Sequence, residues 1–113
     1  ATVPVPSLML LQAPSFHGHT FSIYVELERA AAAGDFAKAL SGDHVNVTRL
    51  AEDSPSNVNV AGQDDIMIAV RRDMHRDNGF WIWAAADNLR LTAITAVECA
   101  ETMATARPKG KVQ

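Results

Sequence analysis

Alternating hydrophobic and polar residues mark the clearest element of the chain, from Phe21 to Leu27. Apolar side chains occupy every second position there, which is the period of a strand with one buried face. Similar patterns predict strands over His44 to Leu50, Ile66 to Val70 and Phe80 to Ala85. The apolar run Ser7 to Gln12 lies between prolines, which predicts a short buried strand that cannot extend past them.

Two helices are predicted between and after these strands. Asp35 is expected to cap the first, which runs to Leu40 and is closed by Gly42. Asp87 offers the N-cap of the second, whose apolar residues recur at helical spacing until Pro108. That stripe consists of Leu89, Ala93, Val97, Ala100 and Ala104.

The connections between these elements indicate the fold class. Residues 51–65 are polar and loop-like, and residues 71–79 form a medium loop that enters a second strand at Asn78-Gly79, as in a hairpin. The order strand, strand, helix, strand, strand, strand, helix does not alternate strictly. The sequence therefore predicts one α+β domain, with a mixed, largely antiparallel sheet that carries its helices on one face.

Composition limits which classes of partner and which cellular compartment are expected. The formal net charge is -3 and the basic residues are scattered among acids, so neither nucleic acid nor a membrane surface is an expected partner. Cys99 is the single cysteine, which fits a reducing compartment, and the cytoplasm is the expected one. No apolar run is long enough to span a membrane. The start at Ala1, without an initiator Met, suggests a piece of a longer protein.

The sequence His17-Gly18-His19 is the main candidate for chemistry. No acidic residue or cysteine lies at a matching near spacing, so no metal site is expected. A histidine on a glycine turn between two strands is well placed to act as a general base. The alternative is that both histidines are loop residues whose polar atoms bond to backbone or water.

Cys99 and the two tryptophans have simpler interpretations. A nucleophilic cysteine needs a helix N-terminus or a neighbouring histidine to stabilise its thiolate, and Cys99 lies in mid-helix, so packing is its expected role. Trp81 and Trp83 alternate on one strand face, where core or interface packing explains large aromatic residues.

Two stretches carry a more specific pattern. The first is Gln12 to Thr20, Gln-Ala-Pro-Ser-Phe-His-Gly-His-Thr, and the second is Trp83 to Arg90, followed by small residues from Ala93 to Glu101. The first resembles the segment Arg-Val-Pro-Val-Phe-x-Gly-His-Ser of aspartate-semialdehyde dehydrogenases. The second resembles that family's tryptophan, its Ala-Asp-Asn-Leu-Arg sequence and its small-residue helix. The resemblance covers roughly residues 7 to 104.

The resemblance implies an oxidoreductase of amino-acid biosynthesis. In that family a cysteine thiolate attacks an aldehyde, a hydride passes to NADP, and phosphate releases an acyl phosphate. His19 maps onto the catalytic histidine that assists the thiol, whereas His17 falls on a variable position. Asn88 maps onto the cofactor-binding asparagine near the nicotinamide. Gln12 maps onto the arginine that grips the substrate carboxylate.

The resemblance also implies a domain plan and partners. Residues 1–106 correspond to part of a C-terminal dimerisation domain with a fold like that of glyceraldehyde-3-phosphate dehydrogenase, and residues 107–113 form a polar tail. The parent protein is expected to use NADP or NAD, whereas the chain alone is expected to bind neither and to be inert. Expected partners are further copies of the chain, in a homodimer or higher homo-oligomer, and a missing N-terminal nucleotide-binding domain.

Departures from the family pattern leave two functions open. Gln12 cannot supply the charged fork of an arginine, which removes about 1.5 to 3 kcal/mol of carboxylate affinity. The form Gln-Ala-Pro-x-Phe-x-Gly-His resembles Usg-type paralogues most closely, and Leu91-Thr92 replaces the usual Lys-Gly. The chain is therefore expected to serve either a semialdehyde dehydrogenase-like enzyme or a non-catalytic paralogue that has kept the pairing surface.

Overall fold

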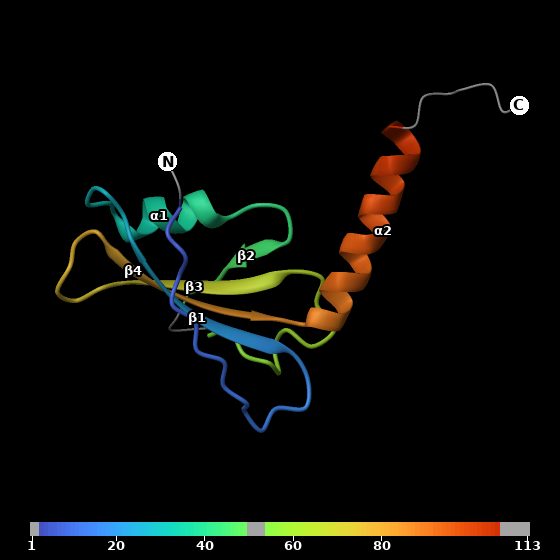
Figure 1. The fold of residues 1–113 in the computed structure, drawn as a ribbon, viewed down its shortest axis with the longest axis horizontal. Coiled ribbons are helices and arrows are strands. Elements are labelled where there is room, and N and C mark those ends of the chain that lie inside the picture. Colours follow the sequence, from blue (N-terminus) through green and yellow to red (C-terminus); the bar gives the residue numbers. More distant parts are fainter. Residues whose placement is uncertain (1–2, 50–53, 107–113) are drawn as a thin grey trace, which may run out of the picture.

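A computed structural model describes residues 3–49 and 54–106 of the chain. It contains a four-stranded sheet, a short helix that lies over one face of the sheet, and a long helix that leaves the end of one strand (Figure 1). The elements in chain order are β1 (His19–Glu26), α1 (Ala33–Leu40), β2 (Val45–Val47), β3 (Ile66–Arg72), β4 (Gly79–Ala86) and α2 (Asn88–Ala106).

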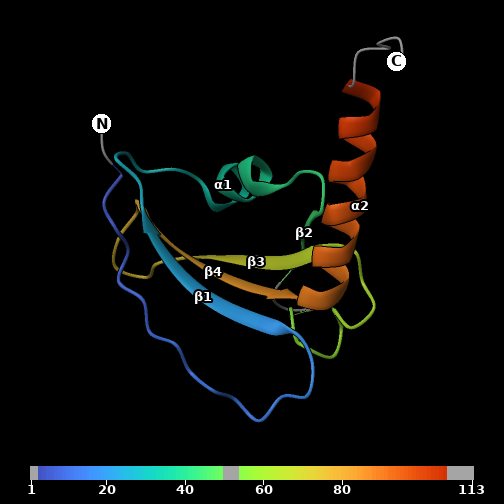
Figure 2. The same cartoon turned by 45° about the vertical axis from the view of Figure 1, so that its right-hand side comes forward.

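The sheet has the strand order β1-β4-β3-β2. Strand β4 pairs antiparallel with both β1 and β3, and β2 pairs parallel with β3. Figure 2 shows α1 and α2 on the same side of this sheet. The predicted α+β class, with a mixed and largely antiparallel sheet and helices on one face, is confirmed.

The core lies between the sheet and α1. Ile68, Ile82 and Ala84 form its buried centre, and Phe36 and Leu40 of α1 pack against it. Phe36 also stacks on the fully buried Phe80, with ring centroids 4.3 Å apart and an interplanar angle of 15°. Because α1 presents these apolar side chains to the sheet, one short helix covers the middle of this face.

The predicted N-cap of α1 is three residues too late. Its N-cap is Ala32 rather than Asp35, which lies in the first turn of the helix. Alanine is the best helix former, so the alanine run extends the helix before the expected cap. The Asp35 carboxylate still stabilises the helix, because it lies near the positive end of the helix dipole. The C-cap is Ser41, one residue before the expected Gly42.

Two predicted strands differ from the structure. Ser7 to Gln12 is exposed and irregular rather than a buried strand. Flanking prolines remove amide donors, and no described backbone pairs with the run, so it lacks the hydrogen bonds that a strand requires. The strand expected from His44 to Leu50 is only Val45–Val47, and His44 is left out of its start because it has a left-handed φ of 63°. Leu50 lies outside the described residues, as does the tail 107–113.

The hairpin between β3 and β4 and the cap of α2 are as predicted. Asp73 holds the hairpin loop, because its Oδ1 accepts hydrogen bonds from the amides of His75 and Arg76 at 2.8 and 3.0 Å. Asp87 caps α2, since its Oδ1 accepts a bond of 3.1 Å from the amide of Arg90.

Helix α2 buries none of its residues. The apolar stripe that begins at Leu89 and includes Val97 is therefore exposed within this chain. Cys99 is exposed as well, so the prediction that it packs is wrong for the described chain. A helix with an uncovered apolar stripe normally packs against another surface, because helices in proteins gain most of their stability from tertiary packing.

The tryptophans lie on the sheet face opposite α1. Side chains alternate along β4, and Ile82 and Ala84 face the core, so Trp81 and Trp83 face the other way. Trp83 donates to the carbonyl of Pro55 at 2.6 Å, and the ring of Trp81 packs against that of Tyr24 at a tilt of 47°, with centroids 4.7 Å apart. The exposed fractions of Trp81 and Trp83 are 45% and 37%, so both rings are available for further contacts.

Candidate functional site

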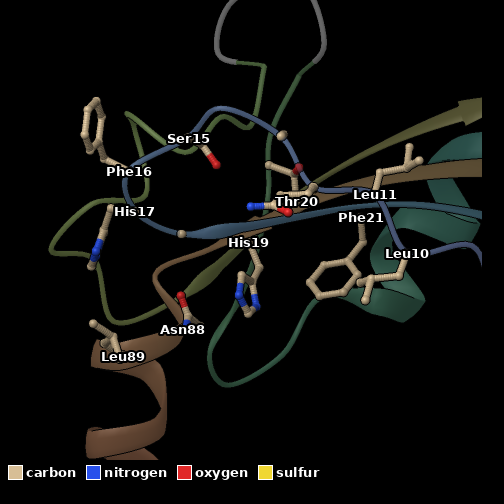
Figure 3. A pocket seen from close by; sticks show the side chains of 13 residues that line it. Leu10, Leu11, Ser15, Phe16, His17, His19, Thr20, Phe21, Asn88 and Leu89 are labelled. Atoms are coloured by element: carbon tan, nitrogen blue, oxygen red, sulfur yellow. The ribbon is translucent and has the colours of Figure 1, made fainter.

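A glycine turn leads into β1 and sets the direction of both histidines. Gly18 has a φ of 84°, in the left-handed region that glycine adopts without strain. A Cβ at this position would lie 3.1 Å from the carbonyl oxygen of Ala86, so the turn lies tightly against the end of β4. His17 and His19 lie on opposite sides of this turn in Figure 3.

One open depression of about 500 Å³ collects the three residues that the sequence singled out for a site. Gln12 comes from the irregular segment before β1, His19 from the first position of β1, and Asn88 from the first turn of α2. The register pairs His19 with Ala86, two residues before Asn88, which brings the strand start and the helix start together. In Figure 3 the ring of His19 projects between Asn88 and Phe21.

The ring of His19 is held by packing alone in the described structure. Its ring meets that of Phe21 edge to face, with centroids 6.3 Å apart and an interplanar angle of 83°. The residue is exposed, and no described residue forms a hydrogen bond with its ring. Both ring nitrogens are thus available to accept a proton from an incoming thiol or to exchange one with a substrate.

His17 is held much more firmly than His19. Its Nε2 lies 2.7 Å from Oδ2 of Asp87, whose exposed fraction is only 4%. The same Oδ2 accepts a hydrogen bond of 2.8 Å from the amide of Gly62, and Oδ1 accepts the bond from Arg90. His17 and these two amides hold the pKa of the Asp87 carboxyl well below its usual range, so this buried group is an anion.

A second, apolar depression of about 550 Å³ adjoins the first. It lies between the sheet, α1 and α2, and it shares His19, Phe21 and Asn88 with the first depression. Its remaining walls are mostly apolar side chains, which come from the sheet (including Ile23 and Ile82), from α1 (Leu40) and from α2 (Leu91). His19 and Asn88 therefore lie where a polar depression meets an apolar one.

A separate cluster lies around His44. Its Nε2 lies 2.8 Å from both carboxylate oxygens of Glu98 in the middle of α2, and its Nδ1 lies 3.4 Å from Oδ1 of Asp65. Glu98 first, and then Asp65, hold the pKa of His44 above its ordinary value, against the effect of burial. The two acids lie on opposite nitrogens of the ring instead of converging on one point. Within residues 3–49 and 54–106, no group of three potential ligands could hold a metal ion.

The family resemblance singled out Gln12, His19 and Asn88, which lie in the depression, but sequence reasoning missed two polar contacts. Neither sequence interpretation of His17, as part of a site or as a loop residue satisfied by backbone or water, included its contact with Asp87. The sequence indicated Asp87 as a helix cap. It did not indicate that this cap lies beside the histidine turn, which is distant along the chain. His44 and Glu98 are 54 residues apart, and nothing in the sequence indicated that they meet.

Comparisons with known proteins agree with the resemblance seen in the sequence. The family described as semialdehyde dehydrogenase, dimerisation domain, matches residues 3–91. The chain is 32% identical over 94 residues to the aspartate-semialdehyde dehydrogenase of Bacillus subtilis, which covers 76% of this chain and 27% of that protein. It is 33% identical over 106 residues to aspartate-semialdehyde dehydrogenase 2 of Vibrio cholerae, covering 87% of this chain and 31% of that protein.

Solved structures show the same relationship. The crystal structure of aspartate semialdehyde dehydrogenase II complexed with ASA, from Vibrio cholerae, matches with a TM-score of 0.72 and 30% identity, covering 82% of this chain and 29% of that one. A probable aspartate-semialdehyde dehydrogenase from Pseudomonas aeruginosa shares the fold, with a TM-score of 0.76 at 22% identity. This chain thus spans less than a third of the length of these relatives. The closer resemblance to Usg-type paralogues stays a prediction.

Proposed function

This chain belongs to the semialdehyde dehydrogenase family, as its dimerisation domain, and we propose that it supplies the histidine and the pairing surface of an oxidoreductase. The proposed reaction of the whole protein is the NAD(P)-dependent oxidation of an aldehyde such as aspartate semialdehyde. The observation that carries this proposal is the depression in which Gln12, His19 and Asn88 lie together.

His19 is the proposed proton-transfer residue. Its ring is exposed in the depression and has both nitrogens available, so it can take a proton from a thiol that the rest of the protein supplies. Cys99 does not supply that thiol, because it does not line the depression. On this proposal the isolated chain performs no turnover, and it transfers protons only when a nucleophile is placed beside His19.

Asn88 is the residue proposed to meet the cofactor, whose nicotinamide accepts a hydride when bound. Asn88 is half-buried, and its side-chain amide has no hydrogen-bond partner among the described residues. An amide both donates and accepts hydrogen bonds, as the carboxamide of a nicotinamide does. The described lining contains no lysine or arginine, so it fits the nicotinamide end of a dinucleotide and not its phosphates.

A non-catalytic role is the second candidate, and Gln12 is the observation that favours it. The described walls of the depression offer a substrate carboxylate no guanidinium or ammonium group. A neutral amide forms weaker bonds to a carboxylate than a planar guanidinium does. On this alternative the chain has kept the fold and pairs subunits without binding the substrate.

Pairing of subunits is proposed to use the sheet face opposite α1. Tyr24, Trp81 and Trp83 lie together there and remain partly exposed. Large aromatic side chains that are already held in place contribute strongly to protein interfaces. The proposed assembly is a homodimer or higher homo-oligomer that also contains a nucleotide-binding domain.

The described helices include none that is long and apolar enough to cross a membrane. The cytoplasm is the proposed compartment.

A chimera tests the enzyme proposal. This chain replaces the matching segment of the Bacillus subtilis relative, and NADP-dependent oxidation of aspartate semialdehyde is measured for the chimera and for its His19→Ala and Gln12→Arg variants. Turnover that falls at least about a hundredfold in His19→Ala supports the proposal. Gln12→Arg is expected to lower KM about tenfold, because it restores the charged fork. A chimera that forms dimers but shows no turnover, even with Gln12→Arg, would favour the non-catalytic role.

A further inference from the structure

The segment before β1 reaches the rest of the molecule through one polar contact. Among the described residues, the contact between His17 and Asp87 is the only hydrogen bond or ion pair that joins residues 3–18 to any later residue. Most of this segment is exposed and irregular. It carries Gln12 and several other residues that line the depression. The position of that wall therefore depends on His17.

Asp87 is a firm point of attachment for this contact. Its side chain is buried, and it already holds the first turn of α2 through the amide of Arg90 and the loop before β3 through the amide of Gly62. Arg90 in turn pairs with Asp64 in that loop. A contact to Asp87 therefore fixes the glycine turn relative to both the start of α2 and the loop before β3.

The geometry of the turn transmits this attachment to His19. Gly18 separates the two histidines and lies against the carbonyl of Ala86. His17 is held on one side of the turn, at the helix cap, and His19 starts β1 on the other side, where its backbone pairs with Ala86 and its ring packs on Phe21 without a polar partner among the described residues. Loss of the contact between His17 and Asp87 would leave the turn immediately before His19 without its polar attachment.

We propose that His17 is a positioning residue, which through Asp87 fixes the turn that carries His19 against the start of α2 that carries Asn88. This inference rests on the proposed function, in which His19 transfers the proton and Asn88 meets the cofactor. His17 itself does not need to touch a substrate. His17 fixes the position of the wall that contains Gln12 and the orientation of the His19 ring, which faces the depression.

The contact should persist over the neutral pH range. A neutral imidazole with its proton on Nε2 and a doubly protonated imidazolium both donate to the Asp87 carboxylate. The lowered pKa of Asp87 keeps that acceptor ionised until the solution is strongly acidic. A glutamine side chain has an amide N–H that can replace Nε2–H of histidine, which makes His17→Gln the conservative variant.

The test uses NMR on the isotopically labelled chain and its His17→Ala, His17→Gln and His75→Ala variants. His75 lies in the exposed loop after β3, and its side chain has no polar contact among the described residues, so it is the matched control. Three quantities are compared: the backbone order of residues 15–18, the contact between the rings of His19 and Phe21, and amide exchange along β1. No substrate or turnover is involved, so the outcome does not depend on whether the protein is an enzyme.

The expected result is local and reversible by glutamine. His17→Ala should raise amide exchange at residues 19–22 about tenfold or more, disorder residues 15–18 and weaken the ring contact, because a charged hydrogen-bond acceptor loses its partner. His17→Gln and His75→Ala should resemble the wild-type chain. Unchanged order in His17→Ala would overturn the proposal. It would also be overturned by a His17→Gln variant as disordered as His17→Ala, or by an equal loss of protection at residues 23–26.

Discussion

Replacement of Phe80 by alanine should remove much of the stability of the chain. The ring is fully buried between the sheet and α1, and it stacks on Phe36. Truncation of a buried phenylalanine to alanine costs about 3 to 5 kcal/mol, because the transfer energy of the ring is lost and a cavity remains. The stacked pair accounts for about 0.5 to 1.5 kcal/mol of that loss.

Urea unfolding measures this effect directly. A domain of this length typically has an unfolding free energy of about 6 to 17 kcal/mol, so the variant should still fold. With a urea dependence of about 1.5 kcal/mol per M, the midpoint should fall by about 2 to 3 M. Tryptophan fluorescence and circular dichroism should report the same midpoint, since Trp81 flanks the mutated position in β4.

Phe16→Ala is the matched control for this experiment. Phe16 has an exposed fraction of 108%, so its truncation should change the unfolding free energy by no more than about 0.5 kcal/mol. Phe80→Leu should fall between the two, because leucine refills part of the cavity but cannot stack on Phe36. Equal midpoints for Phe80→Ala and Phe16→Ala would refute the packing described here.

Three further outcomes are expected. His44→Gln should remove stabilisation that the wild-type chain has below about pH 6.5 and loses as pH rises through the raised pKa of His44, so the two unfolding midpoints should differ at pH 6 and converge at pH 9. Trp83→Ala should weaken self-association in sedimentation velocity, and a wild-type chain that stays monomeric at micromolar concentration would contradict the proposed pairing. The isolated chain should not oxidise aspartate semialdehyde with NADP, and purified activity that disappears in His19→Ala would disprove this.

Much of the sheet follows from local pattern. Strands β1, β3 and β4 were predicted within a few residues, because alternation, apolar runs and the Asn78-Gly79 entry agree with one another. The cap at Asp87 is also a local signal, since the carboxylate bonds to an amide three residues later.

The errors arose where the hydrophobic pattern does not determine the backbone. Ser7 to Gln12 has the apolar character of a strand, but the described chain provides no neighbouring strand for its backbone. His44 has a left-handed backbone conformation, which alternation of side chains does not reveal. For the site, resemblance brought Gln12, His19 and Asn88 to attention, whereas the contact between His17 and Asp87 needed the register of β1 on β4.

The length of α2 turns small changes at its base into large displacements at its tip. A helix of 19 residues is about 28 Å long. It leaves the sheet next to Asp87 and extends away from the body of the molecule (Figure 1). A tilt of about 10° at that base would carry the far end through about 5 Å. The contact between Glu98 and His44, near the midpoint of α2, restrains this tilt. Loss of the contact should therefore cause the largest displacement near Ala106, at the end of the helix.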